Sequence, residues 1–313
     1  MHLSLLLISQ IGSMFIMIAF GYLAVRAGML LPRHGRVLSV LSMYIIGPCM
    51  TLSSFQIEFT YDKLRGLGLA MGAAAIVHVI YIALTKALKK PLKLRDIERA
   101  SLIYSNAGNM IIPLVNATLG MEWVFYTSAF TFVQTFLMWS HARSMISGEN
   151  AADIRKMLLN PNVISKVISF ILFVFRISLP DIVKNAALSV GQMIGPISMI
   201  IVGLLIAGMD KKDLFRYRRV FFVIAGRLIV YPLIITAVFA VLAKTGLHPD
   251  LKQILLIVLL ASSSPSASTI TQLAQVYDCE PEYSGIINIA TIMFCIVTMP
   301  LIVTAYQYLA GML

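Results

Sequence analysis

Long apolar runs separated by short polar stretches dominate this chain. A helix needs about 20 mostly apolar residues to span a bilayer, and ten runs meet or approach that length. They cover residues 5–25, 37–57, 64–85, 98–118, 122–142, 161–179, 188–208, 217–243, 251–276 and 283–309. The pattern predicts an all-α integral membrane protein with ten transmembrane helices.

The composition agrees with this prediction. Hydrophobic residues make up 59% of the chain and charged residues 12%, with a mean hydropathy of +0.87, whereas soluble domains are about 25% charged. The net charge of +11 does not indicate a nucleic-acid partner, because the basic residues fall between apolar runs instead of gathering on one folded face. Cys49, Cys279 and Cys295 lie too far apart in the sequence to suggest a disulfide framework or metal knuckle, and no metal or cofactor is expected.

The distribution of Lys and Arg predicts the orientation. No basic residue precedes Arg26, so the first run is expected to be a retained helix and not a signal peptide. With both termini outside, the inner loops hold 17 basic residues and the outer loops 6, as the positive-inside rule requires. We expect a multi-pass protein of the plasma or inner membrane. Lys166 and Arg176 lie near the ends of the sixth run and are expected to snorkel to the interface.

The runs divide into two sets of five at the polar loop 143–160. Because five is odd, the second set must be inverted relative to the first, which is the usual plan of secondary transporters. The expected repeats are residues 1–147 and 148–313. Three landmarks recur in the same order in both halves: Ile46-Gly47-Pro48 with Ile194-Gly195-Pro196, Pro113 with Pro265, and Glu122 with Glu282.

Polar interruptions in the fourth and ninth runs predict two broken helices. Asn106 and Asn109 are costly in hydrocarbon without partners, and Pro113 removes a backbone donor. In the ninth run, six Ser and Thr residues surround Pro265. Ser264 is a suitable N-cap and Pro265 a suitable first helical residue. New half-helices are therefore predicted to begin at Pro265 and, by analogy, at Pro113.

Two helix N-termini that meet at a repeat interface would favour a carboxylate. The alternative is that the hydroxyls only bond back to helix carbonyls, which we favour for Ser262 and Thr269. The candidate substrate-binding residues are Asn106, Gly108, Asn109, Pro113, Ser263, Ser264, Pro265 and Ser266.

Other polar residues within the runs suggest further roles. Arg227 is expected either to balance the charge of an anionic substrate or to pair with backbone carbonyls. No Asp or Glu lies deep within a run, so no buried carboxylate proton relay is expected. His78 and His141 are expected to be satisfied core histidines. Candidate ligands for a sodium ion, each more readily explained by packing, are Thr131, Gln134, Asn288 and Thr291.

Several stretches resemble the auxin efflux carrier family, which includes the plant PIN-type carriers, and the resemblance spans essentially the full length. It rests on Asn106-Ala107-Gly108-Asn109 through Pro113, Asn160-Pro161-Asn162, Leu179-Pro180, Gly195-Pro196 through Gly203, Pro265 through Tyr277, and Thr291 through Pro300.

The resemblance implies ten helices, with the fourth and ninth crossing at their proline breaks. It also implies a dimeric scaffold of spans 1, 2, 6 and 7, and a transport domain of spans 3–5 and 8–10 that moves as an elevator. The family's crossover asparagine maps to Asn109, less closely to Asn106, and its second crossover proline to Pro265. Family substrates are organic anions, including auxin and malate. The serine cluster and the missing long central loop depart from the plant pattern, and auxin itself is not supported.

These features predict a secondary transporter of a small organic anion, with the bilayer and a second copy of the chain as partners. The alternatives are a sodium-coupled symporter of the bile-acid-symporter type and a channel, although a channel usually shows charge rings or a filter motif. An intramembrane hydrolase would need a base near Ser264, and no motif supplies one. The chain is therefore expected not to be an enzyme.

Overall fold

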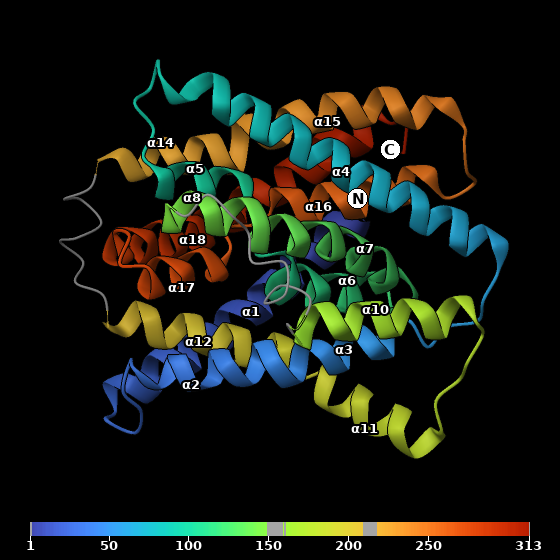
Figure 1. The fold of residues 1–313 in the computed structure, drawn as a ribbon, viewed down its shortest axis with the longest axis horizontal. Helices are drawn as coiled ribbons and strands as arrows, with labels where there is room; N and C mark the ends of the chain where they lie inside the picture. The colour runs from blue at the N-terminus through green and yellow to red at the C-terminus, as the bar shows by residue number, and fades with distance from the viewer. Residues whose placement is uncertain (1, 149–158, 160, 209–217, 313) are drawn as a thin grey trace.

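The computed structural model describes residues 2–148, 159, 161–208 and 218–312, and these form an all-helical protein (Figure 1). Within them no strand is present, apart from one isolated β-bridge between Ser105 and Ser266. The first half contains α1 (His2–Arg26), α2 (His34–Leu41), α3 (Gly47–Ser54), α4 (Tyr61–Lys89), α5 (Asp96–Ile103), α6 (Ile112–Thr118), α7 (Met121–Leu137) and α8 (Arg143–Ser147). The second half contains α10 (Pro161–Val174), α11 (Asp181–Gly191), α12 (Ile194–Gly208), α14 (Arg219–Ala225), α15 (Tyr231–Leu242), α16 (Leu251–Ser263), α17 (Ser268–Val276) and α18 (Pro281–Leu309).

Several helical stretches are long and apolar enough to cross a membrane. In the described residues they are His34–Ser54, Tyr61–Lys89, Asp181–Gly208, Arg219–Thr245 and Pro281–Leu309. Gly12–Arg26, Val163–Val174 and Leu251–Ser263 are shorter apolar helices. Helix occupies part of each of the ten predicted runs. The prediction of an all-helical protein is therefore confirmed for the described residues, and the length and apolar composition of these helices agree with a membrane protein.

Short π-helical segments connect several helices into longer rods. They are η1 (Ser42–Ile46), η2 (Ala107–Ile111), η3 (Met138–Ala142) and η4 (Gly226–Val230), and a single 3₁₀ turn, η5 (Ala243–Thr245), follows α15. Pro48, Pro113 and Pro232 come directly after η1, η2 and η4, within the first two residues of the next helix. The widened turn accommodates a proline ring that would otherwise clash with the preceding turn.

The two predicted helix breaks are present, but the half-helices start elsewhere than predicted. The chain leaves the helix at Tyr104–Asn106 and becomes helical again at Ala107, ahead of Pro113. In the ninth run it leaves the helix at Ser264 and resumes at Ser268, beyond Pro265. The prediction that half-helices begin at Pro113 and Pro265 was therefore wrong. Pro113 lies in helix that is continuous with η2, and Pro265 lies inside the extended segment.

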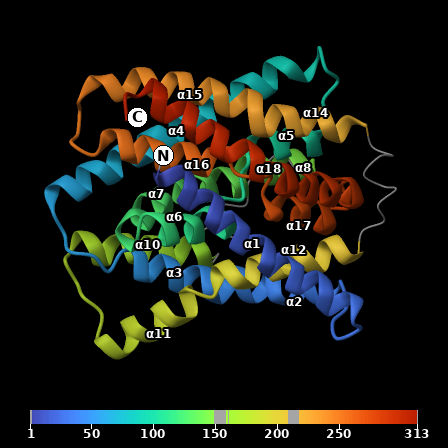
Figure 2. The same ribbon diagram turned by 180° about the vertical axis from the view of Figure 1, so that it is seen from behind.

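The helices gather into two groups with α6 and α7 between them. In Figures 1 and 2, α2, α3, α11 and α12 lie together along one side of the molecule, and α4, α14, α15 and α16 lie along the other. Helix α1 begins and α18 ends towards the same end of the long axis. The interrupted segments lie in the interior, between these groups.

Glycines allow α1 and α12 to pack with their backbones almost in contact. A Cβ atom at Gly203 would lie 2.1 Å from the carbonyl oxygen of Ile18, and one at Gly21 would lie 2.2 Å from that of Ile200. Such small-residue contacts let membrane helices associate through close van der Waals packing. The α1–α12 contact therefore requires glycine at both positions.

We expect Gly203→Ala to lower the melting temperature of the detergent-solubilised protein, because the added methyl group would force two backbones apart. Gly72→Ala in α4 is the matched control, since a Cβ there meets nothing within 4 Å and alanine favours helix by about 1 kcal/mol. Equal melting temperatures for the two variants would contradict the close α1–α12 contact.

Candidate substrate site at the helix crossover

The two unwound segments cross and pair with each other in the interior of the protein. The Asn106 backbone N–H donates to the Pro265 carbonyl at 2.8 Å, and the Ala267 N–H donates to the Tyr104 carbonyl at 3.0 Å. Because Pro265 contributes only its carbonyl, its missing N–H removes no donor that the pairing needs. Backbone groups freed by unwinding are thereby satisfied without water.

Side chains from two neighbouring helices hold the paired serines in the same manner. Gln134 of α7 donates to the Ser105 carbonyl at 2.8 Å and accepts from its N–H at 3.0 Å and its hydroxyl at 2.7 Å. Asn288 of α18 donates to the Ser266 carbonyl at 2.7 Å, and the Thr291 hydroxyl accepts from the Ser266 N–H at 3.1 Å. Each half of the chain thus fixes its own break with amide or hydroxyl groups from the following long helix.

Arg227, in η4, binds the carbonyl ends of both interrupted helices. Its Nε donates to the Ser264 carbonyl at 3.1 Å, and its terminal nitrogens donate to the Ser262 carbonyl at 2.8 Å and the Leu102 carbonyl at 3.0 Å, with Ile103 at 3.4 Å. These oxygens lie at the C-terminal ends of α16 and α5, where helix dipoles are negative. Of the two roles considered for Arg227, the structure shows pairing with backbone carbonyls.

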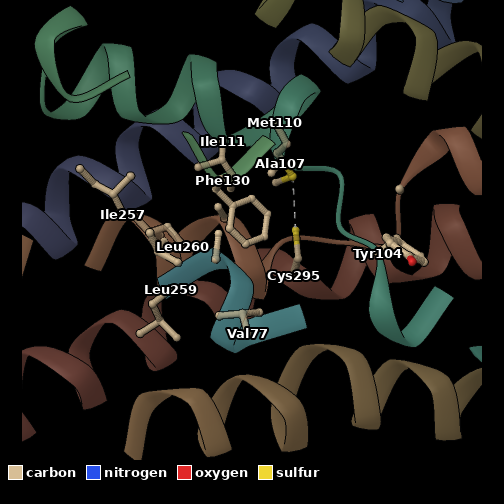
Figure 3. Close-up of a cluster of buried hydrophobic side chains, with 14 of the residues drawn as sticks. Val77, Tyr104, Ala107, Met110, Ile111, Phe130, Ile257, Leu259, Leu260 and Cys295 are labelled. Atoms are coloured by element: carbon tan, nitrogen blue, oxygen red, sulfur yellow. Dashed lines mark hydrogen bonds between the residues drawn. The ribbon is translucent and has the colours of Figure 1, made fainter. Parts of the chain in front are cut away.

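A cluster of buried apolar side chains includes residues next to the first break (Figure 3). Tyr104 begins the first break and Ala107 follows it; both are fully buried, and Phe130 and Leu260 lie in the same cluster. The Cys295 sulfur lies 3.9 Å from the Met110 sulfur. Exclusion of water strengthens the hydrogen bonds at the crossing and raises the cost of leaving any of them unmade.

The predicted substrate residues of the first break divide between the crossing and its surroundings. Asn106 is buried at the crossing, whereas Gly108 and Asn109 are half-buried in η2. Within the described residues, neither asparagine side chain forms a hydrogen bond. Pro113 lies farther along and packs against α12, where a Cβ at Gly195 would lie 2.9 Å from the proline ring.

The serines of the second break have different roles. Ser264 ends α16, and its hydroxyl donates to the Ala261 carbonyl at 3.0 Å. The prediction that Ser264 caps the start of a half-helix was therefore wrong, because that residue closes the preceding helix. The Ser263 hydroxyl is buried without a hydrogen-bond partner, and Ser266 belongs to the bridge.

The four candidate sodium ligands already have protein partners. Gln134 lies on one side of the bridge and Asn288 with Thr291 on the other, each bound to the backbone of its own break. The Thr131 hydroxyl donates to the Ser128 carbonyl at 3.0 Å. Their polar groups thus hold the protein backbone in this conformation.

One polar group at the edge of the fourth run was not singled out from the sequence. Glu98 is fully buried at the start of α5 and accepts hydrogen bonds from two Arg219 nitrogens, both at 2.7 Å, and from the Tyr283 hydroxyl at 2.9 Å. Such bidentate pairs are strong and directional. The sequence signal was Arg95 three residues before Glu98, a spacing that allows an ion pair on a helix, and the Arg95 guanidinium lies 3.5 Å from the carboxylate.

The two membrane histidines differ. His141 Nδ1 lies 2.8 Å from the Tyr104 hydroxyl, as expected for a satisfied core histidine. His78 Nδ1 binds the Ala74 carbonyl at 2.7 Å, but Nε2 has no hydrogen-bond partner. Its ring lines a largely apolar cavity of about 370 Å³ between α4 and α7.

A sequence comparison assigns the chain to a family. A profile described as "Membrane transport protein" matches residues 6–153 and 149–303, which together cover most of the chain. The chain belongs to the auxin efflux carrier family. No curated protein matches this family member. Membership of this family shows that the protein is a membrane transporter. The interrupted helices of this transporter form the crossover described above.

We expect Gln134→Leu to destabilise this auxin efflux carrier family member. The substitution leaves the Ser105 N–H and carbonyl buried without their side-chain partner, at a cost of about 1–3 kcal/mol for each group. Thermal unfolding in detergent measures the effect. Gln192→Leu is the matched control, because Gln192 is exposed between α11 and α12. A Gln134→Leu protein as stable as the Gln192→Leu protein would show that the amide does not hold the break.

Proposed function

We propose that the protein is a secondary transporter that moves a small organic anion by elevator-type alternating access, with the substrate held beside the helix crossover. The observation that carries this proposal is the pairing of two interrupted helices through Ser105 and Ser266. Non-helical backbone persists at membrane depth only where it is buried in protein or lines a cavity. Transporters place substrate and ion sites at such discontinuous helices.

The electrostatics of the crossover favour an anion. The half-helices that begin at Ala107 and Ser268 direct their positive ends towards it. The negative ends of α5 and α16 are bound by Arg227, so their field is largely compensated. The free amides of Asn106 and Asn109 add hydrogen-bond donors that can orient a carboxylate.

The proposal includes the domain organisation expected from the sequence. It has ten spans in two inverted repeats, residues 1–147 and 148–313. Helices α1, α2–α3, α10 and α11–α12 would form the scaffold and the dimer contact, and the other spans would move. The equivalent hydrogen bonds from α7 to Ser105 and from α18 to Ser266 support a repeat relationship between the two halves of the chain. Both termini would lie on the outer side of the membrane.

Reconstitution tests the transport class. Purified protein in liposomes loaded with unlabelled malate should accumulate labelled malate by counterflow, with saturable initial rates. Flux that rises linearly without saturation or counterflow would indicate a channel, and consumption of the solute would indicate an enzyme. Failure to move malate, succinate, acetate and indole-3-acetate would contradict transport of organic anions.

We expect Asn109→Ala to weaken carboxylate binding by about tenfold or more, because a hydrogen bond to a charged group contributes about 1.5–3 kcal/mol. Asn116→Ala is the matched control, since Asn116 is a half-buried asparagine farther along α6. Both variants should melt near the wild-type temperature. An unchanged binding isotherm for Asn109→Ala would remove this residue from the site.

A further inference from the structure

A second basic side chain is buried within the apolar runs, and its surroundings contradict the expectation from the sequence. Lys166 of α10 is 7% exposed, and its ammonium donates to the Thr131 carbonyl at 2.8 Å and the Thr135 hydroxyl at 2.6 Å. Lys166 therefore does not snorkel to the membrane interface. Arg176, beyond the end of α10, is exposed as expected.

The charge of Lys166 is poorly compensated. Both of its acceptors are neutral, and within the described chain no carboxylate pairs with it. Arg227, by contrast, binds four carbonyls at two negative helix ends. An ammonium buried without an opposite charge is unfavourable, and basic residues inside membrane spans commonly mark substrate or ion pathways.

Lys166 is hydrogen-bonded to α7, the helix whose Gln134 side chain binds the first break. Thr131, Gln134 and Thr135 lie within about one turn of α7, and the Gln134 amide binds Ser105 at the crossover. Lys166 reaches the same turn of α7 from α10. Its ammonium therefore lies on the α10 side of the helix that fixes the proposed substrate site.

Further polar groups lie along the same stretch of α7. The Ser128 hydroxyl is 3.0 Å from the Ser54 hydroxyl of α3. The Thr127 side chain is fully buried, and its hydroxyl has no hydrogen-bond partner. A buried hydroxyl without a partner is uncommon in a folded protein and requires an explanation. Thr127 lies about one turn before Thr131 on α7, so this hydroxyl lies on the same helix as the two acceptors of Lys166.

We propose that Lys166 is the charge partner of the transported anion, in the role the sequence offered to Arg227. This inference rests on the proposed function. The lysine has a flexible four-carbon stem and three donors, so its ammonium can exchange the Thr131 carbonyl and Thr135 hydroxyl for a substrate carboxylate. Arg227, held by four carbonyls, keeps the crossover intact. Lys166 therefore supplies a full positive charge in addition to the helix ends and amides of the crossover.

Thermal-shift titration with succinate, malate and acetate separates this role from a structural one. Lys166→Met should melt at or above the wild-type temperature, because the uncompensated charge is gone, and should bind succinate at least tenfold more weakly. Lys166→Arg should retain most of the succinate response. Lys184→Met, at an exposed lysine of α11, should behave as wild type.

Lys166→Gln is a second test in case Lys166→Met does not fold, because the glutamine amide carries no charge but can still donate to the Thr131 carbonyl. If Lys166→Gln or Lys166→Met binds succinate as tightly as wild type, the assignment of Lys166 is overturned. A lower melting temperature with an unchanged succinate affinity would identify a structural residue. A wild-type protein that responds to none of the three carboxylates would overturn the anion proposal itself, and this inference with it.

Discussion

The structure depends on the mutual satisfaction of two stretches of unwound backbone. Inside a bilayer no water replaces a lost helical hydrogen bond, and each unpaired N–H or carbonyl costs several kcal/mol. Tyr104–Asn106 and Ser264–Ala267 meet this demand by pairing with each other. Neither break would be stable alone, so the N-terminal and C-terminal halves of the chain are coupled at this point.

The surrounding polar side chains follow from the same constraint. Gln134 and Asn288 donate hydrogen bonds to the Ser105 and Ser266 carbonyls, which the pairing alone leaves unsatisfied. Arg227 compensates the two negative helix ends that the breaks create. In the sequence these polar residues suggest ligand binding. In the structure they bind the backbone of the broken helices. Lys166 differs because no such requirement explains its charge.

The sequence predicted the overall class and the location of the breaks, because both depend on local composition. Apolar length predicted helices in all ten runs, and clustered Asn, Gly, Ser and Pro predicted the interruptions. The start of each half-helix was mispredicted, because a proline can also follow a π-helical turn within continuous helix, as at Pro113, or lie in an extended segment, as at Pro265. Pairing of Arg227 with backbone carbonyls was one of the two predicted roles, but the particular carbonyls, and the partners of Lys166, were beyond sequence reasoning, since they lie on other helices and depend on how those helices pack.

Cross-linking of the two breaks tests the central claim most directly. Ser105 and Ser266 form the non-hydrogen-bonded pair of the bridge, whose Cα atoms lie about 4.5 Å apart in such pairs, within the range for a disulfide. Cys49, Cys279 and Cys295 would first be replaced by alanine. Ser105→Cys combined with Ser266→Cys should then form an intramolecular disulfide, detectable by mass spectrometry of the digested protein, whereas Ser105→Cys with Thr298→Cys should not. Absence of the 105–266 cross-link in folded protein under oxidising conditions would contradict the paired crossover.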